Sequence, residues 1–377
     1  MRVIFACAGT GGHINPAIAI ANIILKHDPS SKILFIGTKT GIENELVKNA
    51  GFDIKHIETG KLIRSFTFKN ISAVTKTNRG VTEAKRIIKE FKPDIVIGTG
   101  GYICVPVMIA ARKNKTPYIL HESNAYPGIA VKILSKRASK VMVGFLDAKS
   151  RLKREDNVVY TGTPTKFNKK DIDILDVDSC KADLKLQNIN KKIILVTGGS
   201  QGATCFNQVV LDMVIDRLSS EFFVILVTGS KNYDDIIKKI KEIEKEKNID
   251  LSNYIKIEKF IYDMTKMYKV ADLCITRAGA MTITELEIAR KPAILVPLPT
   301  AAENHQYFNA KTLEQKGLGI IIEQKNFDKN ILYSKIENML NVPKNKINLK
   351  GNLEVYEDEN IVYDKIYSCI SEVLKSR

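Results

Sequence analysis

Residues 3–17 read VIFACAGTGGHINPA, in which an apolar run leads through glycines into a helical segment. Residues 193–203 read IILVTGGSQGA and repeat this order of strand, glycine turn and helix. Glycines let the backbone approach a ligand closely, and the helix that follows offers unpaired N–H groups and a partial positive charge to a phosphate. Two such turns, far apart in the chain, predict two similar α/β domains in tandem with a cleft between them.

Apolar strands alternate with helical segments along the chain, which is typical of parallel sheets covered by helices on both faces. The strands expected in the first half are 2–7, 32–36, 53–57, 95–98, 118–121, 140–143 and 158–161. Those expected in the second half are 193–197, 223–227, 255–260, 273–276, 293–296 and 319–322. Helices of the first half should open near Pro16, Gly41, Val81, Tyr102 and Gly128.

The strand and helix pattern stops at Thr161-Gly162-Thr163-Pro164, and a polar, charged stretch follows it. This change predicts a first domain over residues 1–163 and a second over residues 164–354. A terminal helix is expected over residues 354–375, and in a two-domain enzyme such a helix can cross back to pack on the first domain. The remaining question is what this pair of domains binds.

Composition narrows the class of protein. The 377 residues are 44% hydrophobic and 27% charged, which suits a soluble globular protein with two cores. No apolar run approaches the roughly 20 residues that a membrane span needs. The six cysteines lie far apart, without metal-ligand spacing or a disulfide framework. Neither a metal nor a cofactor is expected.

A formal net charge of +16 points to an anionic partner, for which nucleic acid and anionic membrane are the usual candidates. Residues 61–92 carry nine Lys and Arg against two acidic residues. Apolar side chains are interleaved with these charges, namely Leu62, Ile63, Phe66, Phe68, Ile71 and Val74. This mixture favours an anionic membrane surface over nucleic acid. An ordinary solvated loop and helix is the alternative.

A third ligand signature lies in residues 276–287, TRAGAMTITELE, where a strand ends and a helix begins. The spacing places the amides of Ala280, Met281 and Thr282 at a site of diphosphate size, with Glu285 about one turn into the helix. The turn at residues 9–13 lacks the spacing of a dinucleotide fingerprint, and the turn at residues 198–203 lacks the Lys-Ser/Thr of an ATP-binding loop. His13, at the tip of its turn, is a candidate general base, with acceptor binding without proton transfer as the alternative.

Six short motifs, together with Glu285, stand in a fixed order along the chain. They are GTGGH (9–13), GTGGY (98–102), HESN (121–124), GGSQGA (198–203), RAGA (277–280) and NHQYFNA (304–310). In this order they resemble the MurG family of bacterial peptidoglycan glycosyltransferases over nearly the whole chain. The resemblance implies the GT-B architecture, in which two Rossmann-like domains with parallel sheets face a deep cleft. It also implies inverting transfer of GlcNAc from UDP-GlcNAc to the C4 hydroxyl of MurNAc in undecaprenyl-diphospho-MurNAc-pentapeptide, which converts lipid I to lipid II.

The resemblance assigns roles to individual residues. On the donor side it implies Ser200 and the neighbouring Gly199 at the diphosphate, Ile261 at uracil, Glu285 at ribose, and His305 and Gln306 at the sugar. Further donor-side positions are Thr10, Gly11, Gly12, Gln201, Arg277, Ala280, Met281 and Thr282. His13 is implied as the catalytic base, and the acceptor-side positions are Gly100, Gly101, Tyr102, Glu122, Asn124 and Lys166. Several family members have arginine in place of Lys166 and glutamine in place of His305, so both contacts would differ here.

The family resemblance further implies a peripheral protein on the cytoplasmic face of the cell membrane. Its partners would be UDP-GlcNAc, the undecaprenyl-linked muramyl-pentapeptide, the anionic inner-membrane surface, and proteins of cell-wall synthesis and division, with no nucleic acid. Two alternatives stay open at this point. One is a GT-B transferase with another lipid acceptor, and the other is a non-catalytic UDP-sugar-binding protein of the division machinery.

Overall fold

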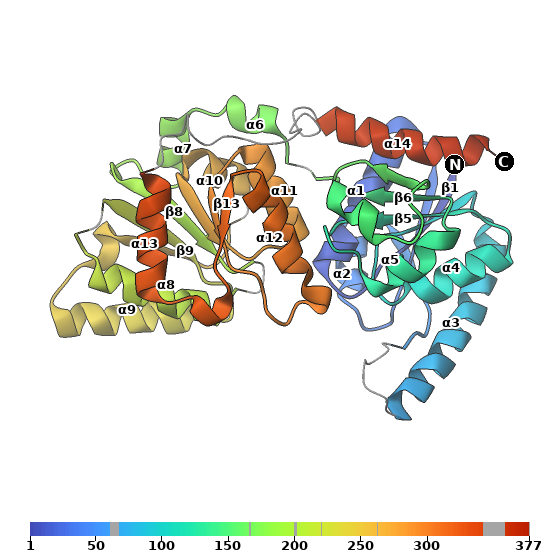
Figure 1. Cartoon of the computed structure of the whole chain (residues 1–377), viewed down its shortest axis with the longest axis horizontal. Coiled ribbons are helices and arrows are strands. Elements are labelled where there is room, and N and C mark those ends of the chain that lie inside the picture. Colours follow the sequence, from blue (N-terminus) through green and yellow to red (C-terminus); the bar gives the residue numbers. More distant parts are fainter. Residues whose placement is uncertain are drawn as a thin grey trace. The chain divides into compact units, whose positions relative to one another are not determined.

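The computed structural model describes residues 1–60, 68–165, 167–199, 202–219, 221–261, 263–341 and 359–376. The chain forms two compact units, one of Met1–Lys166 with Glu359–Arg377 and the other of Phe167–Asp358. Each unit is built on its own parallel β-sheet flanked by helices (Figure 1). The predicted α/β class with two Rossmann-like halves is therefore confirmed.

The first unit contains a seven-stranded sheet with the order β3-β2-β1-β4-β5-β6-β7. Val, Ile and Leu fill its central strands because both faces of the sheet are covered. The strands are β1 Arg2–Ala6, β2 Lys32–Gly37, β3 Asp53–His56, β4 Ile95–Gly98, β5 Tyr118–Glu122, β6 Lys140–Val143 and β7 Val158–Tyr160. Each is within two residues of its expected bounds at either end.

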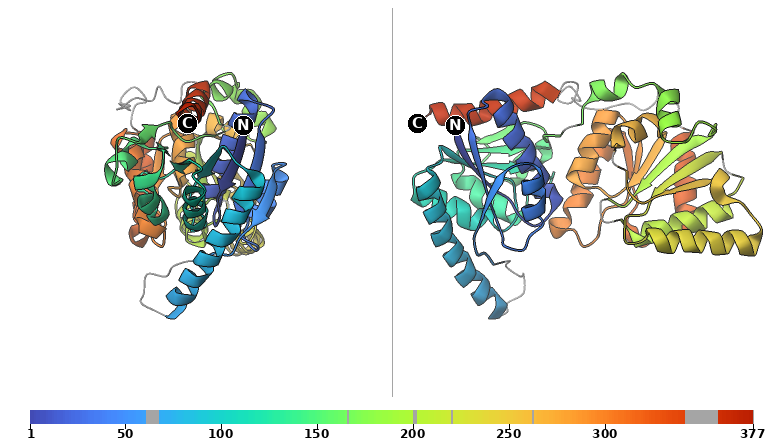
Figure 2. Two further views of the ribbon diagram at one scale, coloured as in Figure 1. Left: turned by 90° about the vertical axis from the view of Figure 1, so that its right-hand side faces the viewer. Right: turned by 180° about the vertical axis from the view of Figure 1, so that it is seen from behind.

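Helices of the first unit cover both faces of this sheet. Their bounds are α1 Gly11–His27, α2 Glu43–Asn49, α3 Phe68–Phe91, α4 Cys104–Lys113, α5 Ile129–Leu134, η1 Ser135–Arg137, η2 Leu146–Arg151 and α14 Glu359–Lys375. One hydrophobic core joins α3, α4, α5 and η2 to the sheet. The terminal helix α14 packs on α1 and on β6, as Figure 2 shows from behind. The Tyr363 hydroxyl of α14 donates to the Thr165 carbonyl at 2.9 Å.

Two helix starts differ from the sequence expectation, and both involve glycine. Helix α1 begins at Gly11 and not near Pro16, so the glycines of the turn form its first helical residues. Helix α3 begins at Phe68 and not near Val81, and Gly80 lies inside it. A Cβ on Gly80 would stand 2.0 Å from the Glu58 carbonyl oxygen, so this glycine allows close packing and does not end the helix. The other three helices begin close to their expected positions.

The second unit contains a six-stranded sheet with the order β10-β9-β8-β11-β12-β13. The strands are β8 Lys192–Thr197, β9 Phe222–Val227, β10 Ile255–Glu258, β11 Leu273–Thr276, β12 Ala293–Leu295 and β13 Gly319–Ile321. The helices are α6 Lys169–Asp173, α7 Val177–Asp183, α8 Thr204–Asp216, α9 Tyr233–Lys247, η3 Leu251–Asn253, α10 Met264–Val270, α11 Ala280–Ala289, η4 Ala302–Asn304, α12 His305–Gln315, η5 Gln324–Asn326 and α13 Lys329–Leu340. Its core includes Phe206, Val210 and Leu211 of α8, packed with buried residues of the sheet.

The strand order reverses once in each sheet, between β1 and β4 in the first unit and between β8 and β11 in the second. At both places the neighbouring strands end in register, because Ala6 pairs with Gly98 and Thr197 pairs with Thr276. Open α/β sheets bind ligands outside the carboxyl ends of their strands at such switch points. Among the helices that the structure describes, none is long and apolar enough to cross a bilayer.

Candidate functional site

His13 lies in the first turn of α1, directly after the switch-point strand β1. Gly9 has φ +102°, a conformation that L side chains rarely adopt, and the Thr10 carbonyl accepts the His13 amide at 3.0 Å. The imidazole Nδ1 lies 3.1 Å from the Ala8 carbonyl oxygen. Because a carbonyl only accepts, Nδ1 carries the proton in the neutral ring and Nε2 keeps its lone pair.

Burial lowers the pKa of His13 from its usual value, and the hydrogen bond to Ala8 opposes this shift. The neutral imidazole with a basic Nε2 is therefore the prevailing form near pH 7. This protonation state and tautomer are what a general base requires.

The loop after β4 packs directly on His13. Gly100 has φ +115°, and a Cβ there would stand 2.5 Å from the His13 Cδ2. Gly101 approaches the β1–α1 turn in the same way, since its Cβ would lie 2.4 Å from the Ala8 carbonyl oxygen. The Thr99 hydroxyl donates to the His13 carbonyl at 2.7 Å. Of the predicted acceptor-side positions, Gly100 and Gly101 thus stand beside His13, and the partly buried Tyr102 follows them.

Glu122 and Asn124 lie at the end of the next strand, β5. The Glu122 side chain is buried, and its Oε1 accepts from the Asn124 amide at 2.9 Å and from Asn124 Nδ2 at 3.0 Å. Its Oε2 accepts from the amide of Gly128, the residue before α5, at 2.8 Å. This carboxylate therefore shapes the loop that carries Asn124.

Sequence reasoning missed Glu43, which is fully buried at the start of α2. Its Oε1 accepts from the amide and hydroxyl of Thr38 at 2.9 and 2.6 Å, and its Oε2 accepts from the Gly9 amide at 3.4 Å. Glu43 thereby ties the β1–α1 turn to the loop after β2. The one sequence feature that marks this contact is the glycine at position 41. In the structure, a Cβ on Gly41 would stand 2.0 Å from the Glu43 carboxylate, so only glycine leaves room for it.

In the second unit, the glycine turn after β8 is compact. Gly199 and Gly202 have φ +85° and +72°, and a Cβ on Gly202 would lie 2.2 Å from the Thr228 carbonyl oxygen. Helix α8 starts at Thr204, after Ala203. Ser200, Gln201 and Lys166 lie outside the described residues.

Helix α11 begins at Ala280, next to that turn across the β8–β11 switch point. Gly279 precedes it without a side-chain cap, and its first turn contains no acidic residue. The first amides of a helix have no intrahelical partner. Ala280, Met281 and Thr282 therefore present amides and a positive helix end, and the anion site predicted at them stays a prediction.

Glu285 lies one turn further along α11 and is partly buried. Burial raises its pKa to about 7, while a hydrogen bond from Tyr268 works in the opposite direction. The Tyr268 hydroxyl stands 3.1 Å from Oε2. The Glu285 carboxyl group thus changes its charge near neutral pH.

Arg277, at the end of β11, is engaged within its own unit. Its guanidinium donates to the carbonyls of Val296 and Pro297 at 3.1 and 3.4 Å and to Gln324 Oε1 at 2.7 Å. The guanidinium also stacks over the Phe206 ring, with 4.7 Å between Cζ and the ring centroid. These contacts give Arg277 a structural role in fastening the segment after β12, so a direct donor contact would have to replace some of them.

Of the remaining donor-side positions in the second unit, His305 and Gln306 begin helix α12, and Ile261 lies in the loop after β10. The Gln306 Oε1 accepts from the Leu298 amide at 2.9 Å, and His305 Nδ1 lies 2.7 Å from the Ala302 carbonyl oxygen. Glu303 and Asn304 before them have φ +55° and +53°, a strained conformation of the kind that clusters at ligand sites. Ile261 follows β10 and is partly exposed.

Comparison with known proteins connects these two switch-point sites to a family. The Glycosyltransferase family 28 N-terminal domain matches residues 3–143, and the family 28 C-terminal domain matches residues 193–360. A UDP-N-acetylglucosamine–N-acetylmuramyl-(pentapeptide) pyrophosphoryl-undecaprenol N-acetylglucosamine transferase of Acetivibrio thermocellus is 39% identical over 100% of this chain and 99% of its own length. The transferase of the same description from Alkaliphilus metalliredigens is 35% identical over 100% of both chains.

Among solved structures, MurG of Acinetobacter baumannii matches with a TM-score of 0.71 and 26% identity, covering 99% of this chain and 98% of that one. Each family domain matches most of one unit, and both relatives extend across the two units. On this evidence the chain belongs to glycosyltransferase family 28 and, within it, to the MurG family of GT-B enzymes.

Proposed function

We propose that this protein transfers GlcNAc from UDP-GlcNAc to the C4 hydroxyl of MurNAc in undecaprenyl-diphospho-MurNAc-pentapeptide, with inversion at the anomeric carbon. The observation that carries the proposal is the full-length similarity to transferases that are named for this donor and acceptor. The first unit would bind the acceptor and the second unit the donor. Each unit offers a glycine turn at its own switch point for this purpose.

The chemistry is a single displacement. The His13 Nε2 removes the proton from the C4 hydroxyl while the bond between GlcNAc and phosphate breaks, and UDP departs with additional negative charge. The amides at the start of α11 and the glycine turn after β8 stabilise that charge as it develops. Glu285 accepts hydrogen bonds from the ribose hydroxyls, and Gln306 and His305 contact the sugar.

A turnover assay with defined substrates tests this proposal. With UDP-GlcNAc and a polyprenyl-diphospho-MurNAc-pentapeptide, we expect one UDP and one β-linked disaccharide product per turnover. Diacylglycerol offered in place of that acceptor should give no product. Transfer to diacylglycerol alone would establish a different lipid acceptor, and donor binding without transfer to either acceptor would establish a non-catalytic binding protein.

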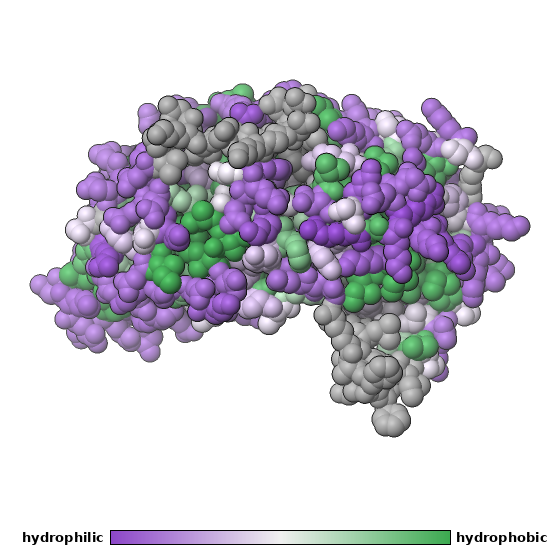
Figure 3. All heavy atoms as spheres, in the orientation of Figure 1, coloured by the Kyte–Doolittle hydropathy of each residue, from purple (hydrophilic) through white to green (hydrophobic). Residues whose placement is uncertain are grey.

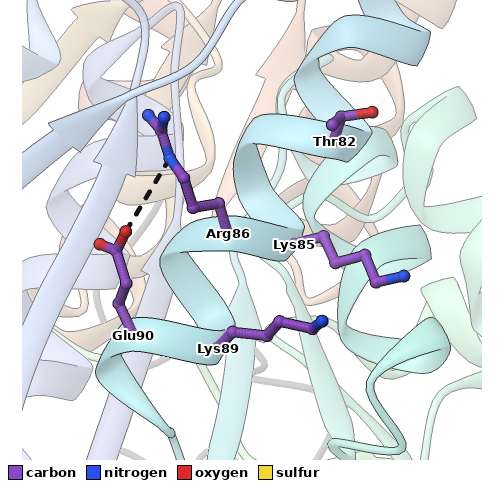
Figure 4. Close-up of a pocket in the computed structure, with 5 residues that line it drawn as sticks. All are labelled: Thr82, Lys85, Arg86, Lys89 and Glu90. Carbon is purple, nitrogen blue, oxygen red and sulfur yellow. Dashed lines mark ion pairs between the residues drawn. The ribbon is translucent and has the colours of Figure 1, made fainter.

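We also propose that the layer formed by α3, α4 and α5 faces an anionic membrane, where the lipid-linked acceptor resides. Three basic side chains project from α3, namely Lys85, Arg86 and Lys89 (Figure 4). Of these three, only Arg86 forms an ion pair with another described residue, with 3.9 Å between its Nε and Glu90 Oε1. Hydrophobic side chains gather on this unit beside α4 and α5 (Figure 3). Of the apolar residues interleaved with the charges of residues 61–92, Val74 is 50% exposed. The others lie outside the described parts of the structure, namely Leu62, Ile63, Phe66 and the side chains of Phe68 and Ile71.

Helix α5 adds two exposed apolar side chains to this layer, Ile129 at 50% and Ile133 at 63%. Replacing both by serine should reduce the vesicle binding that survives high salt. Replacing Lys85 and Lys89 by glutamine should instead reduce binding at low salt, at about 1 kcal/mol per lysine near an anionic surface. Cosedimentation with anionic and neutral vesicles over a salt series measures both effects.

Matched controls come from the second unit. Ile174→Ser removes a side chain that is 81% exposed, and Lys241→Gln with Lys245→Gln removes two charges from α9. These controls should bind vesicles as the parent does. If the α3 and α5 variants fold and also bind vesicles like the parent at every salt concentration, this layer is not the membrane surface.

A further inference from the structure

Tyr268 is a fully buried side chain whose hydroxyl reaches the candidate ribose-binding acid. It lies on α10 and is 2% exposed, and its hydroxyl donates to Glu285 Oε2 at 3.1 Å. Phe167 packs edge-on against its ring, with 5.3 Å between centroids and an interplanar angle of 81°. Burial and the contact with Phe167, at the start of the second unit, hold the Tyr268 ring in place, and this fixes the position of its hydroxyl.

We propose that Tyr268 is the positioning residue for Glu285, holding one carboxylate oxygen so that the acid keeps the orientation and charge that the ribose hydroxyls need. This inference rests on the proposed donor function. Tyr268 itself would not contact the substrate. Its effect would pass through the single hydrogen bond to Glu285.

The hydrogen bond acts on both orientation and charge. A carboxylate accepts bonds from ribose hydroxyls better than a neutral carboxyl group does, because the charged acceptor makes the stronger bond. The hydroxyl of Tyr268 favours the charged form and so lowers the pKa of Glu285 against the effect of burial. Burial and the neighbouring carboxylate raise the pKa of Tyr268 well above its usual value, so the residue remains a donor at neutral pH.

Other charged groups on the elements packed around α11 have partners of their own. Lys169 pairs with Asp173 on α6, Lys266 of α10 pairs with Asp183, and Lys311 pairs with Glu314 on α12. Glu287, on α11 itself, pairs with Lys316 at 2.8 Å. Cys274 of β11 lies near Tyr268, and burial raises the pKa of that thiol to about 12, so it is neutral. Burial and Tyr268 are thus the two influences on Glu285.

Tyr268→Phe tests the proposal because it removes the hydroxyl and keeps the ring. We expect the affinity for UDP-GlcNAc to fall roughly 3- to 30-fold at pH 8. The midpoint of its pH dependence should also move to higher pH, since the charged carboxylate has lost a donor. UDP-GlcNAc is the ligand of choice for calorimetry from pH 5.5 to 8.5, because both ends of its diphosphate are esterified and its phosphates do not titrate there.

Tyr333→Phe is the matched control, because Tyr333 on α13 is also hydrogen-bonded to a glutamate, Glu337. It should leave the affinity and the pH midpoint unchanged. Phe167→Leu is a second test should Tyr268→Phe fail to fold, since it retains the hydroxyl but loosens the ring. It should shift the midpoint in the same direction by a smaller amount.

The outcomes separate the positioning role from the donor function on which it rests. If the folded Tyr268→Phe variant has the same pH midpoint as the parent, the positioning role is overturned, even if its affinity falls equally at every pH. If that variant does not fold, an unchanged midpoint in Phe167→Leu has the same consequence. A parent protein that does not bind UDP-GlcNAc, or a Glu285→Gln variant that binds it as tightly and with the same pH dependence, would instead overturn the donor assignment.

Discussion

His13→Ala should lower turnover roughly 10²- to 10⁴-fold, the usual loss when a general base is removed, while the affinity for UDP-GlcNAc stays at the parent value. The reason is the hydrogen bond of Nδ1 to the Ala8 carbonyl, which leaves Nε2 as the basic atom. Steady-state kinetics with both substrates and calorimetry with UDP-GlcNAc measure the two quantities. Burial lowers the pKa of His13, so activity should persist to a lower pH than an exposed histidine would allow and fall as the ring becomes protonated.

His27→Ala is the matched control, because His27 ends the same helix and stacks on Tyr367 with 4.2 Å between ring centroids. This variant should keep its turnover. Loss of donor affinity in His13→Ala with turnover intact at saturation would identify His13 as a binding residue and not as the base.

Glu285→Ala should weaken the binding of UDP and UDP-GlcNAc alike by about 1–3 kcal/mol, or roughly 5- to 150-fold, because it leaves the ribose hydroxyls unpaired. Calorimetry with both nucleotides is the direct measurement. Unchanged UDP affinity in the folded variant would rule out the assigned contact between Glu285 and ribose.

The same acid should make a ligand-free protein less stable in alkaline solution. Its pKa is raised from 4.5 to about 7, so its contribution to stability is present below pH 4.5 and is lost as the pH rises through 7. Glutamine has no charge to bury. Glu285→Gln should therefore unfold at a higher temperature than the parent at pH 8 and at nearly the same temperature at pH 5, whereas equal unfolding temperatures at pH 8 would contradict the burial cost.

The strands were predictable from the sequence, because runs of β-branched residues between glycines and charged segments indicate strands of a sheet that is buried on both faces. Residues 95–98 and 273–276 form strands with the expected bounds. The starts of α1 and α3 were not predictable, because a glycine normally weakens a helix and here packing outweighs that preference. The three glycine-bearing turns were visible in the sequence, since each combines a strand end, glycines and a helix start.

Contacts between distant parts of the chain were beyond any local pattern. Glu43 supports the amide of Gly9 from the next strand–helix unit. Tyr268 reaches Glu285 across an intervening strand, so neither residue signals the other in the sequence. Such pairs become visible only when the sheet brings the carboxyl ends of its strands together.

The return of α14 to the first unit bears on how this protein is made. The first unit is discontinuous in sequence, since Glu359–Arg377 completes it after the whole of the second unit. During synthesis, domains tend to fold in order from the amino terminus. Here α14 can cover the surface of α1 and β6 only after Glu359–Arg377 has left the ribosome, and Val362, Ile366 and Ile370 become buried only then. The newly made first unit thus exposes an apolar surface throughout translation of the second, and chaperone binding during that interval is the expected cost of this topology.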